Sequence, residues 1–380
     1  MESKNNNSDF NSFLLNLSQS FHILDSMIDF VRILDIEGLV LYENRSLQNY
    51  CYRELLSTVH ATDTYLGIST RLMPPALSAD TLEKGVITTT ELSVKSRVFS
   101  VKSTPVFDRD NRVQACVEVF RDITEANNLT VQLYLDNQKI QQEMRLARSI
   151  QTSMLPEITD FGEIHFDYRY IPSDELSGDF FDLIPLGAGR LGLYITDVVG
   201  HGISASILTM FVRQTMRNIL EEEKITEPAS VLKKMRKRFN EMDLDEGQYF
   251  SLFYAVIDTV NRTLTYANAG HNCPPILFRY DQVEQLECTG MLISNIFESY
   301  DYKQKTMGLE RGYRFLFFTD GIIETENENH QAFGYEKLEE ILLEKPDRLL
   351  DRIVQELSDF RAGDQKDDIA LLLVETPRML

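Results

Sequence analysis

Apolar and polar residues alternate in short runs between residues 21 and 124, and acidic residues and glycines separate the runs. The stretch VRILDIEGLVLYEN has apolar runs on both sides of Asp35–Gly38, where an acidic residue and a glycine suit a hairpin turn. A second hairpin is predicted around Asp108–Asn111, because SRVFSVKSTPVF and RVQACVEVF alternate as half-buried strands do. The region 47–83 has a helical and irregular pattern. We therefore expect a small N-terminal α+β unit.

A single long helix is predicted for residues 125–156, because this stretch has no glycine and its one proline is the last residue. Apolar residues recur along it at the spacing of a coiled-coil seam, although Asp136 and Glu143 interrupt the second row. The pattern leaves two interpretations open: a weak parallel coiled coil that joins two subunits, or a helix that packs on the following domain. The seam residues are Ala126, Leu133, Ile140, Ala147 and Met154 at the a positions, with Leu129 and Ile150 at the d positions.

Aspartates flank two apolar strands in the second half of the chain. Asp179 comes immediately before one strand and Asp197 immediately after the next, and a Gly-Ala-Gly turn lies between the strands. Because each aspartate is nine positions from Ala188, an antiparallel hairpin would place both carboxylates side by side at its open end. Facing carboxylates repel each other, and a hard divalent cation relieves that repulsion.

Acidic strand ends recur nearer the C-terminus. The strand-like stretch YRFLFF leads to Asp320 and Gly321, while Asp367 and Asp368 come directly before the apolar run IALLLV. A single aspartate at a strand end is ordinarily a turn former. Acids at four strand ends of one domain instead favour a metal centre.

Five segments occur in order over residues 177–372: SGDFFD, DVVGHG, YANAGHNCPP, FFTDGIIE and DDIALL. This set resembles the metal-dependent protein phosphatases (PPM family), and the preceding EMRLARSIQTSMLPE resembles the linker helix of their SpoIIE/RsbU-type branch. The resemblance implies an αββα sandwich, two antiparallel sheets flanked by helices, with a two-metal centre at one edge. With the N-terminal unit, the expected fold class is α+β. The implied activity is hydrolysis of phosphoserine or phosphothreonine in proteins.

The resemblance also implies which residues bind metal. Asp197 would bridge two divalent cations, Mn²⁺ or Mg²⁺, and the backbone carbonyl of Val198 would complete one coordination shell. Two such cations activate water for in-line attack on phosphorus, so no nucleophilic cysteine is needed. The remaining ligands would be Asp179, Asp320 and Asp367, with Asp368 as the alternative to Asp367.

Neighbouring residues are assigned less directly. His201 could donate a proton to the leaving serine oxygen, or it could be a structural hydrogen-bonding group in its turn, and His271 is equally ambiguous. Asp182 and Glu324 are expected to form hydrogen bonds nearby rather than to bind metal. Ser177 stands where the family commonly has glycine, and its small side chain should preserve close backbone approach. No arginine has a spacing that identifies it as a phosphate clamp.

The N-terminal unit, with two hairpins around a helical segment and FRDITE before the long helix, resembles a PAS sensor domain. That resemblance implies a bound signal or ligand, which the sequence does not identify. The expected organisation is an N-terminal extension at 1–20, a PAS-like domain at 21–124, a linker helix at 125–156 and a PPM-type phosphatase domain at 157–380.

A sensor, a helical connector and a phosphatase in one chain indicate a signalling device. We expect a homodimer formed through the PAS-like domain and the linker helix. The family branch implies a phosphorylated regulatory protein as substrate, of the anti-sigma-factor-antagonist type found in bacterial partner-switching pathways.

The composition excludes several classes of function. A net charge of −21 disfavours nucleic acid and anionic lipid as partners. The N-terminus does not read as a secretory signal, and no apolar run reaches the roughly 18 to 20 residues that span a bilayer. A cytoplasmic protein is therefore expected. The four cysteines lack paired CxxC spacing, so neither a zinc cluster nor a disulfide framework is indicated.

Two other functions fit parts of the sequence. DVVGHG superficially resembles the glycine-rich nucleotide loop of histidine-kinase ATPases, which would make the chain a PAS-linked ATP-binding signalling kinase. However, the long helix has no phospho-accepting histidine motif, and the acidic strand ends would be unexplained. The other alternative is a non-catalytic scaffold, which loss of metal binding would favour.

Overall fold

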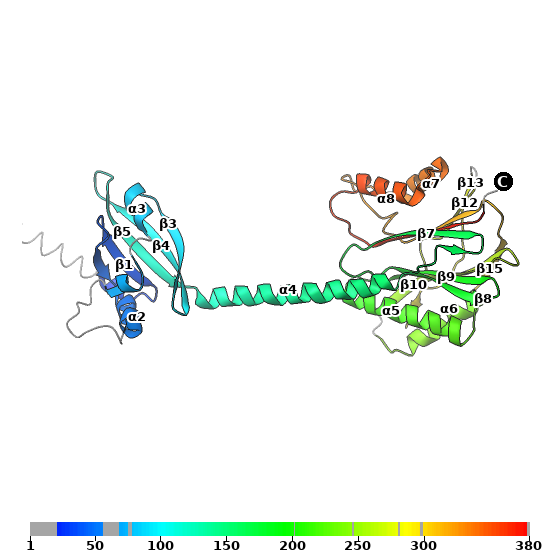
Figure 1. Cartoon of the computed structure of the whole chain (residues 1–380), viewed down its shortest axis with the longest axis horizontal. Helices are drawn as coiled ribbons and strands as arrows, with labels where there is room; N and C mark the ends of the chain where they lie inside the picture. The colour runs from blue at the N-terminus through cyan, green and yellow to red at the C-terminus, as the bar shows by residue number, and fades with distance from the viewer. Residues whose placement is uncertain are drawn as a thin grey trace, which may run out of the picture. The chain divides into compact units, whose positions relative to one another are not determined.

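The computed structural model of the chain describes residues 21–55, 68–74, 78–200, 202–244, 247–279, 282–296 and 299–377. The chain divides into two compact units, residues 1–139 and residues 140–380. The division falls inside one helix, α4 (Thr124–Ser153), which is labelled in Figure 1. The single long helix predicted from the sequence is therefore confirmed.

The first unit has one antiparallel sheet of five strands in the order β2-β1-β5-β4-β3. Both predicted hairpins are confirmed, as β1–β2 and β4–β5. The polar stretch TTTELSV forms β3, a strand that we did not predict, because it pairs only at the sheet edge with β4. The elements are β1 (Phe30–Asp35), β2 (Val40–Glu43), α2 (Arg45–Leu55), the 3₁₀ turn η1 (Ile68–Arg71), α3 (Ala79–Lys84), β3 (Thr88–Val94), β4 (Arg97–Phe107) and β5 (Val113–Asp122).

A buried ion pair lies in the core of this unit. Arg32 on β1 faces Glu118 on β5, and their side chains meet at 2.6 Å with both fully buried. The same guanidinium donates to the Ser69 hydroxyl at 3.0 Å and to the Met73 carbonyl at 2.6 Å. Because an unpaired charge in a protein interior is costly, this pair ties the sheet to the segment that follows α2.

Most of α4 is exposed. Leu129, Leu133 and Ile140 of the predicted seam are 55%, 65% and 50% exposed, and Gln151 is the helix's only buried residue. The interpretation that the helix packs along its own catalytic domain therefore fits only its last turns.

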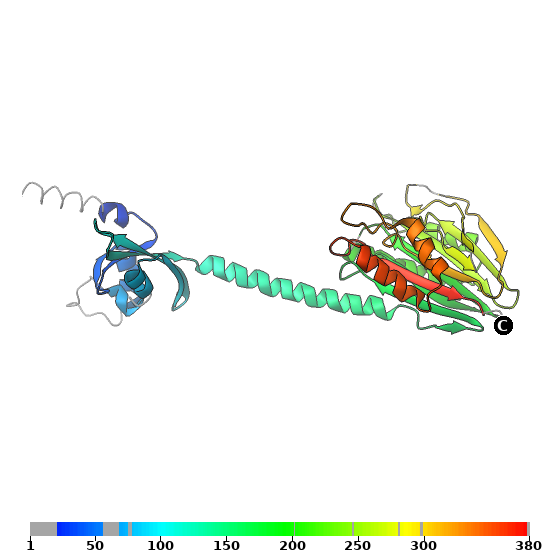
Figure 2. The ribbon, with the colours of Figure 1, turned by 90° about the horizontal axis from the view of Figure 1, so that it is seen from above.

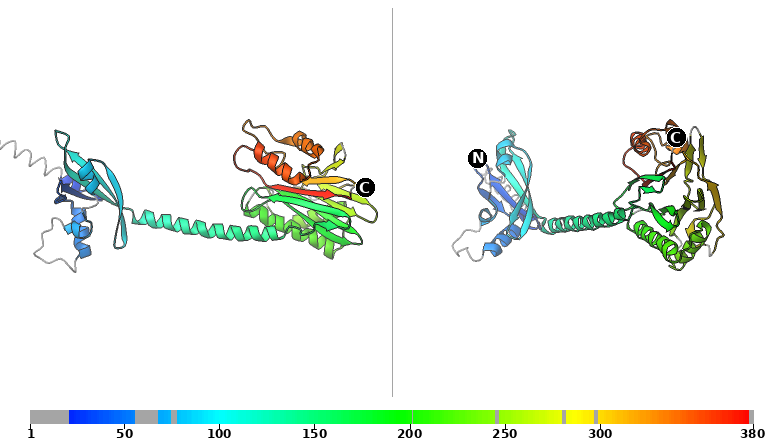
Figure 3. Two further views of the ribbon diagram at one scale, coloured as in Figure 1. Left: turned by 45° about the horizontal axis from the view of Figure 1, so that its top comes forward. Right: turned by 45° about the vertical axis from the view of Figure 1, so that its right-hand side comes forward.

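The second unit is a sandwich of two six-stranded antiparallel sheets, with helices on both outer faces (Figure 1, Figure 3). The expected αββα architecture is confirmed. The first sheet has the order β15-β11-β10-β9-β8, with β14 paired to β10, and the second has the order β13-β12-β16-β17-β7-β6. Seen from above, α7 and α8 lie across the outer face of the second sheet (Figure 2), while α5 and α6 cover the first.

The strands of the second unit form the two sheets. These are β6 (Asp160–Phe161), β7 (Ile164–Ile171), β8 (Phe180–Gly187), β9 (Arg190–Val198), β10 (Tyr249–Asp258), β11 (Thr263–Ala269), β12 (Ile276–Arg279), β13 (Gln282–Gln285), β14 (Ile293–Ser294), β15 (Gln304–Gly308), β16 (Arg314–Phe318) and β17 (Ile369–Glu375). The helices are α5 (Ile203–Arg217), the π-helical turn η3 (Asn218–Glu222), α6 (Pro228–Asn240), α7 (Gly334–Glu344) and α8 (Leu349–Phe360).

The central strands are buried on both faces, which explains their almost continuous apolar sequences. Residues of β8, β9 and β10 pack against α5 and α6 on one side and against the second sheet on the other. A separate apolar cluster fills the space between the second sheet and α7 and α8.

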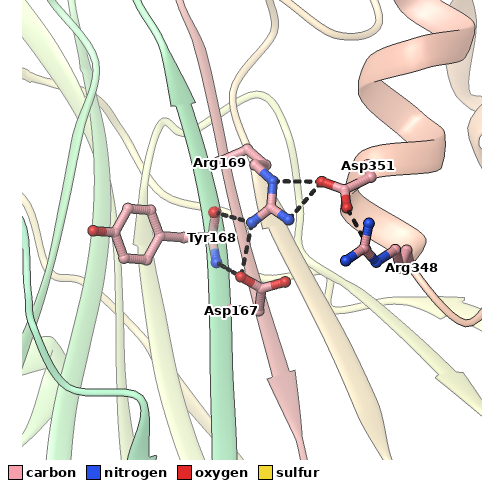
Figure 4. Close-up of polar contacts among 5 residues, drawn as sticks. All are labelled: Asp167, Tyr168, Arg169, Arg348 and Asp351. Carbon is pink, nitrogen blue, oxygen red and sulfur yellow. Dashed lines mark hydrogen bonds and ion pairs between the residues drawn. The ribbon is translucent and has the colours of Figure 1, made fainter.

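A network around Arg169 fixes α8 on the second sheet (Figure 4). The guanidinium of Arg169 on β7 donates to Asp351 of α8 at 2.8 and 2.5 Å and to Asp167 at 2.8 Å. Arg348 lies on the far side of the same aspartate, at 3.9 Å. This network anchors the first turn of α8 on β7.

Candidate metal centre

The β8–β9 hairpin places Asp179 opposite Asp197. Phe180 pairs with Thr196, so one further step along this register brings the two aspartates into line at the open end. Ala188 takes a left-handed conformation (φ 51°) between two glycines that also have positive φ, which closes the predicted turn. Asp197 itself lies opposite Ser251 on β10. The sequence prediction of a hairpin with adjacent acids is thus confirmed at the level of the backbone.

The second sheet brings its own acids to the corresponding edge. Phe318 of β16 pairs with Leu371 of β17, and Thr319 and Ala370 then exchange hydrogen bonds of 3.2 and 3.0 Å. Asp320 leaves β16 just where Asp367 leads into β17. Carboxylates therefore gather from strand ends that are far apart in the sequence.

Three carboxyl groups at this edge form a compact cluster. Oxygens of Asp320, Glu324 and Asp367 all lie within 4.8 Å of one another. The carboxylates of Asp320, Asp367, Asp368 and Glu324 also raise the pKa of Asp197, after the larger effect of burial, to about 7. The predicted acids of both sheets thus lie within electrostatic reach of each other.

Asp179 gives independent support for a cation. Its side chain is buried, and its Oδ2 atom has no hydrogen-bond partner among the described residues. Burial and the neighbouring Asp197 raise the pKa of Asp179 well above its ordinary value. An orphaned carboxylate oxygen beside further carboxylates is unfavourable unless a cation or proton neutralises it. Hard oxygen ligands of this kind suit Mg²⁺ or Mn²⁺, so the residues present fit the expected metals.

The adjacent aspartates Asp367 and Asp368 have different surroundings. Asp368 is buried and accepts hydrogen bonds from the Ser173 backbone and hydroxyl at 2.7 and 2.9 Å and from the Gly178 backbone at 2.8 Å. Both of its carboxylate oxygens are therefore engaged by the loop before β8. Asp367 is exposed and belongs to the three-carboxylate cluster. This contrast favours Asp367 over Asp368 as a ligand.

The Val198 carbonyl lies against Gly178. A Cβ atom at Gly178 would be 2.7 Å from the Val198 oxygen and 3.1 Å from the Gly200 oxygen. The Val198 amide also donates to the Gly178 carbonyl at 3.3 Å. The glycine of the SGD segment is therefore required for the close approach of this carbonyl.

His271 links the two sheets beneath the acids. Its Nε2 lies 3.0 Å from the Phe318 carbonyl, and its Nδ1 lies 3.0 Å from the Ser251 hydroxyl. A carbonyl only accepts hydrogen bonds, so Nε2 carries the proton and Nδ1 accepts from Ser251. Burial lowers the pKa of His271 to about 4. Of the two interpretations of His271 from the sequence, the structural one fits. His201, the candidate general acid, lies outside the described residues.

The rest of the NAGHN segment fixes the position of His271. Asn268 bonds the backbone of His271 through both atoms of its amide, at 2.7 and 3.0 Å. Asn272 donates to the Asp320 carboxylate at 3.0 Å, and Tyr335 donates to the Asn272 carbonyl at 3.2 Å. The segment thus connects the strand opposite Asp197 with the carboxylate of Asp320.

The last turn of α4 forms hydrogen bonds with the loop that carries Asp179. Gln151 accepts a hydrogen bond from the Ser177 amide at 3.1 Å and donates to the Ser177 carbonyl at 2.8 Å. The Ser177 hydroxyl in turn accepts from the Asp179 amide at 3.1 Å. Serine is therefore compatible with the position where the family commonly has glycine, and here it adds a contact.

Sequence reasoning missed two of these residues. Glu324 was expected only to hydrogen-bond nearby, but the turn after β16 brings it into the three-carboxylate cluster. Its spacing of four from Asp320 was the available signal. Gln151 gave no signal, because a glutamine on a polar helix resembles any solvated position. Asp182 is as expected a local partner, since it forms ion pairs with Arg217 at 2.9 Å and Arg213 at 3.7 Å.

The family model described as "Stage II sporulation protein E (SpoIIE)" matches residues 187–377, about half of the chain. The chain belongs to the SpoIIE family. The match begins after the SGDFFD segment and includes the other four motif segments.

Two curated relatives come from Bacillus subtilis (strain 168). "Phosphoserine phosphatase RsbP" is 31% identical over 190 residues, which cover 48% of this chain and 45% of the relative. "Phosphoserine phosphatase RsbU" is 29% identical over 229 residues, which cover 58% of this chain and 61% of the relative. The chain thus spans about half the length of the curated relatives it matches.

Two solved structures show the same fold. The SiaA-PP2C domain of Pseudomonas aeruginosa matches with a TM-score of 0.56 and 23% identity, over 63% of this chain and 98% of that one. The PP2C phosphatase domain of SpoIIE from Bacillus subtilis, with a fragment of its regulatory domain, matches with a TM-score of 0.50 and 14% identity, over 86% and 94%. None of the helices in the described part of the chain is long and apolar enough to cross a bilayer.

Proposed function

We propose that this chain is a protein serine/threonine phosphatase that depends on Mn²⁺ or Mg²⁺. The observation that carries the proposal is the convergence of carboxylates from four strand ends, with a buried oxygen on Asp179 that has no hydrogen-bond partner in the described part of the chain. The curated relatives named phosphoserine phosphatases support the same reaction.

Two divalent cations would be held by the acids of the two sheets. Asp197 would bridge them, the Val198 carbonyl would complete one coordination shell, and Glu324 is an additional candidate ligand. When bound, the ions lower the pKa of water and offset the negative charge of the phosphoryl group. The remaining ligands of this proposal are Asp179, Asp320 and Asp367.

The reaction is hydrolysis of a phosphate monoester. One oxygen–phosphorus bond forms from water, the bond between phosphorus and the side-chain oxygen breaks, and that oxygen leaves with a proton. His201 is the proposed donor of that proton. The chain holds the acids in position through the hydrogen bonds of the NAGHN segment and those between Gln151 and Ser177.

The first unit is proposed as a PAS-like sensor. Its antiparallel sheet of five strands, with helices between β2 and β3, is consistent with that class. The exposed apolar residues of α4 support a homodimer joined through the PAS-like domain and this helix. A signal that shifts the helix would reach Asp179 through Gln151, since both lie in one chain of hydrogen bonds.

The substrate is proposed to be a phosphorylated regulatory protein of the anti-sigma-factor-antagonist type, in a bacterial partner-switching pathway. A cytoplasmic location belongs to the same proposal. The support is family membership and similarity to the two Bacillus phosphatases.

The test is hydrolysis of a phosphoserine peptide by the full chain, with and without Mn²⁺. We expect turnover only with the metal, and a loss of at least about a hundredfold in Asp197→Ala and Asp320→Ala, because each removes a ligand. Lys345→Ala, a substitution in the α7–α8 connection, is the control and should retain activity. Metal-independent turnover, or full activity in both aspartate variants, would contradict the assignment.

A further inference from the structure

A pocket of about 280 Å³ opens beside the three-carboxylate cluster. It lies between the segment that follows β16 and the segment that precedes β17, and these strands are antiparallel neighbours. Glu324 and Asp367 belong both to its lining and to the carboxylate cluster. The pocket is therefore continuous with the proposed metal centre.

Two cationic side chains line this pocket, and they differ in their partners. Lys366 pairs with Glu326 at 3.2 Å and is largely exposed. Arg361 is half-buried, and its Nε atom is buried with no hydrogen-bond acceptor among the described residues. Its Nη1 makes only a long contact of 3.4 Å with Gln365, and no carboxylate in the described part of the chain forms an ion pair with it.

The backbone holds Arg361 in this position. It caps the C-terminus of α8, donating its amide to the Leu357 carbonyl at 3.0 Å. The next amide, of Ala362, donates to the Glu326 carbonyl at 3.0 Å. Gln365 then donates to the carbonyls of Ile171 and Asp367 at 2.8 and 2.7 Å. The guanidinium is therefore presented by an ordered segment joined to both walls of the pocket.

The charge of the lining indicates when an anion can bind. Arg361 and Lys366 face four carboxylates, those of Glu324, Glu326, Asp364 and Asp367. Without metal this surface repels a phosphate, whereas divalent ions on the adjoining acids would make it attractive. A planar guanidinium suits phosphate oxygens because it donates two parallel hydrogen bonds.

We propose that Arg361 is the phosphate-binding arginine of this site, and that the pocket receives the phosphate group of a phosphoserine or phosphothreonine side chain once the metals are bound. The inference rests on the proposed phosphatase function and extends it to the substrate's phosphate. Lys366, already paired with Glu326, has an auxiliary role.

The direct test measures binding of inorganic phosphate to the full chain by calorimetry, with and without Mg²⁺. Binding is expected only with Mg²⁺. Arg361→Gln should weaken it about tenfold or more, which is the effect of losing a charge-assisted hydrogen bond. Lys366→Gln should change it less than about threefold. Arg352→Gln, at the other end of α8, is the matched control and should bind phosphate as the unaltered chain does.

Two further readouts separate this inference from its alternatives. Arg361→Gln should bind Mg²⁺ normally, and it should raise KM for a phosphoserine peptide about tenfold while lowering kcat less, with partial recovery in Arg361→Lys. Normal phosphate affinity in Arg361→Gln, or phosphate binding that needs no Mg²⁺, would overturn the inference. If the unaltered chain lacks Mn²⁺-dependent turnover but still needs Arg361 for phosphate, the proposed function fails and the binding site stands.

Discussion

Gln151 and Ser177 are joined by two hydrogen bonds: the Gln151 side chain donates to the Ser177 carbonyl and accepts from the Ser177 backbone amide. Gln151 lies in the last turn of the long helix, and Ser177 is two residues from the candidate ligand Asp179. The contact gives the helix a direct mechanical connection to the loop that positions this aspartate.

Replacing Gln151 should therefore weaken metal binding as well as stability. In Gln151→Ala the buried Ser177 amide and carbonyl lose their partners, which costs about 1 to 3 kcal/mol of unfolding free energy. We expect a several-fold loss of Mn²⁺ affinity in calorimetry. Gln138→Ala, an exposed change on the same helix, serves as the control; equal Mn²⁺ affinities in both variants would contradict a connection through Ser177.

His271 should make the folded state sensitive to acid. Its pKa is about 4 in the folded chain and 6.5 when unperturbed, so the unfolded chain takes up a proton first as the pH falls. Its contribution to stability is complete above pH 6.5 and is lost as the pH falls to about 4, amounting to about 3 kcal/mol. Urea unfolding from pH 7 to pH 4 should show a shallower loss in His271→Gln than in the unaltered chain. Parallel pH profiles would contradict the buried, neutral histidine.

Metal affinity should rise with pH. Asp197 has a pKa raised to about 7 by burial and by neighbouring carboxylates, so below pH 7 a bound cation must displace its proton. We expect Mn²⁺ affinity to increase by at least about tenfold per pH unit below 7, because burial and Asp197 also raise the pKa of Asp179, whose proton must be displaced as well. Titrations between pH 5.5 and pH 8 would show this dependence. They extend from about one and a half pH units below that pKa to about one unit above it. A flat profile would mean that this carboxyl group is already ionised.

The approach of Gly178 to the Val198 carbonyl leads to a steric prediction. Gly178→Ala would place a Cβ atom 2.7 Å from the carbonyl oxygen, so the loop must shift, with a cost of about 1 to 3 kcal/mol and a large loss of Mn²⁺ affinity. Gly308→Ala on β15 meets no atom within 4 Å and should leave metal binding unchanged. Thermal unfolding and Mn²⁺ calorimetry of both variants would test the difference, and normal Mn²⁺ binding by Gly178→Ala would remove the carbonyl from the site.

The sequence was informative where function depends on regular register. Nine residues on either side of Ala188 were enough to place Asp179 opposite Asp197, because an antiparallel hairpin fixes which residues face each other. The acids at Asp320 and Asp367 were recognisable because each adjoins an apolar strand.

Contacts made by irregular segments or across sheets could not be predicted in this way. Gln151 reaches Ser177 only because the chain turns after α4, and His271 bridges strands from both sheets. Arg361 follows a helix and has no motif around it. Its significance comes from a guanidinium that lines a pocket and has no carboxylate partner among the described residues, which is a property of three-dimensional packing.

Anomalous diffraction at the manganese absorption edge, from crystals of the full chain grown with Mn²⁺, is the most direct test of the proposed metal centre. Two manganese peaks are expected at the strand edge, with Asp197 between them, the Val198 carbonyl on one, and oxygens of Asp179, Asp320 and Asp367 as further ligands. Manganese bound elsewhere, or no peak beside Asp197, would contradict it.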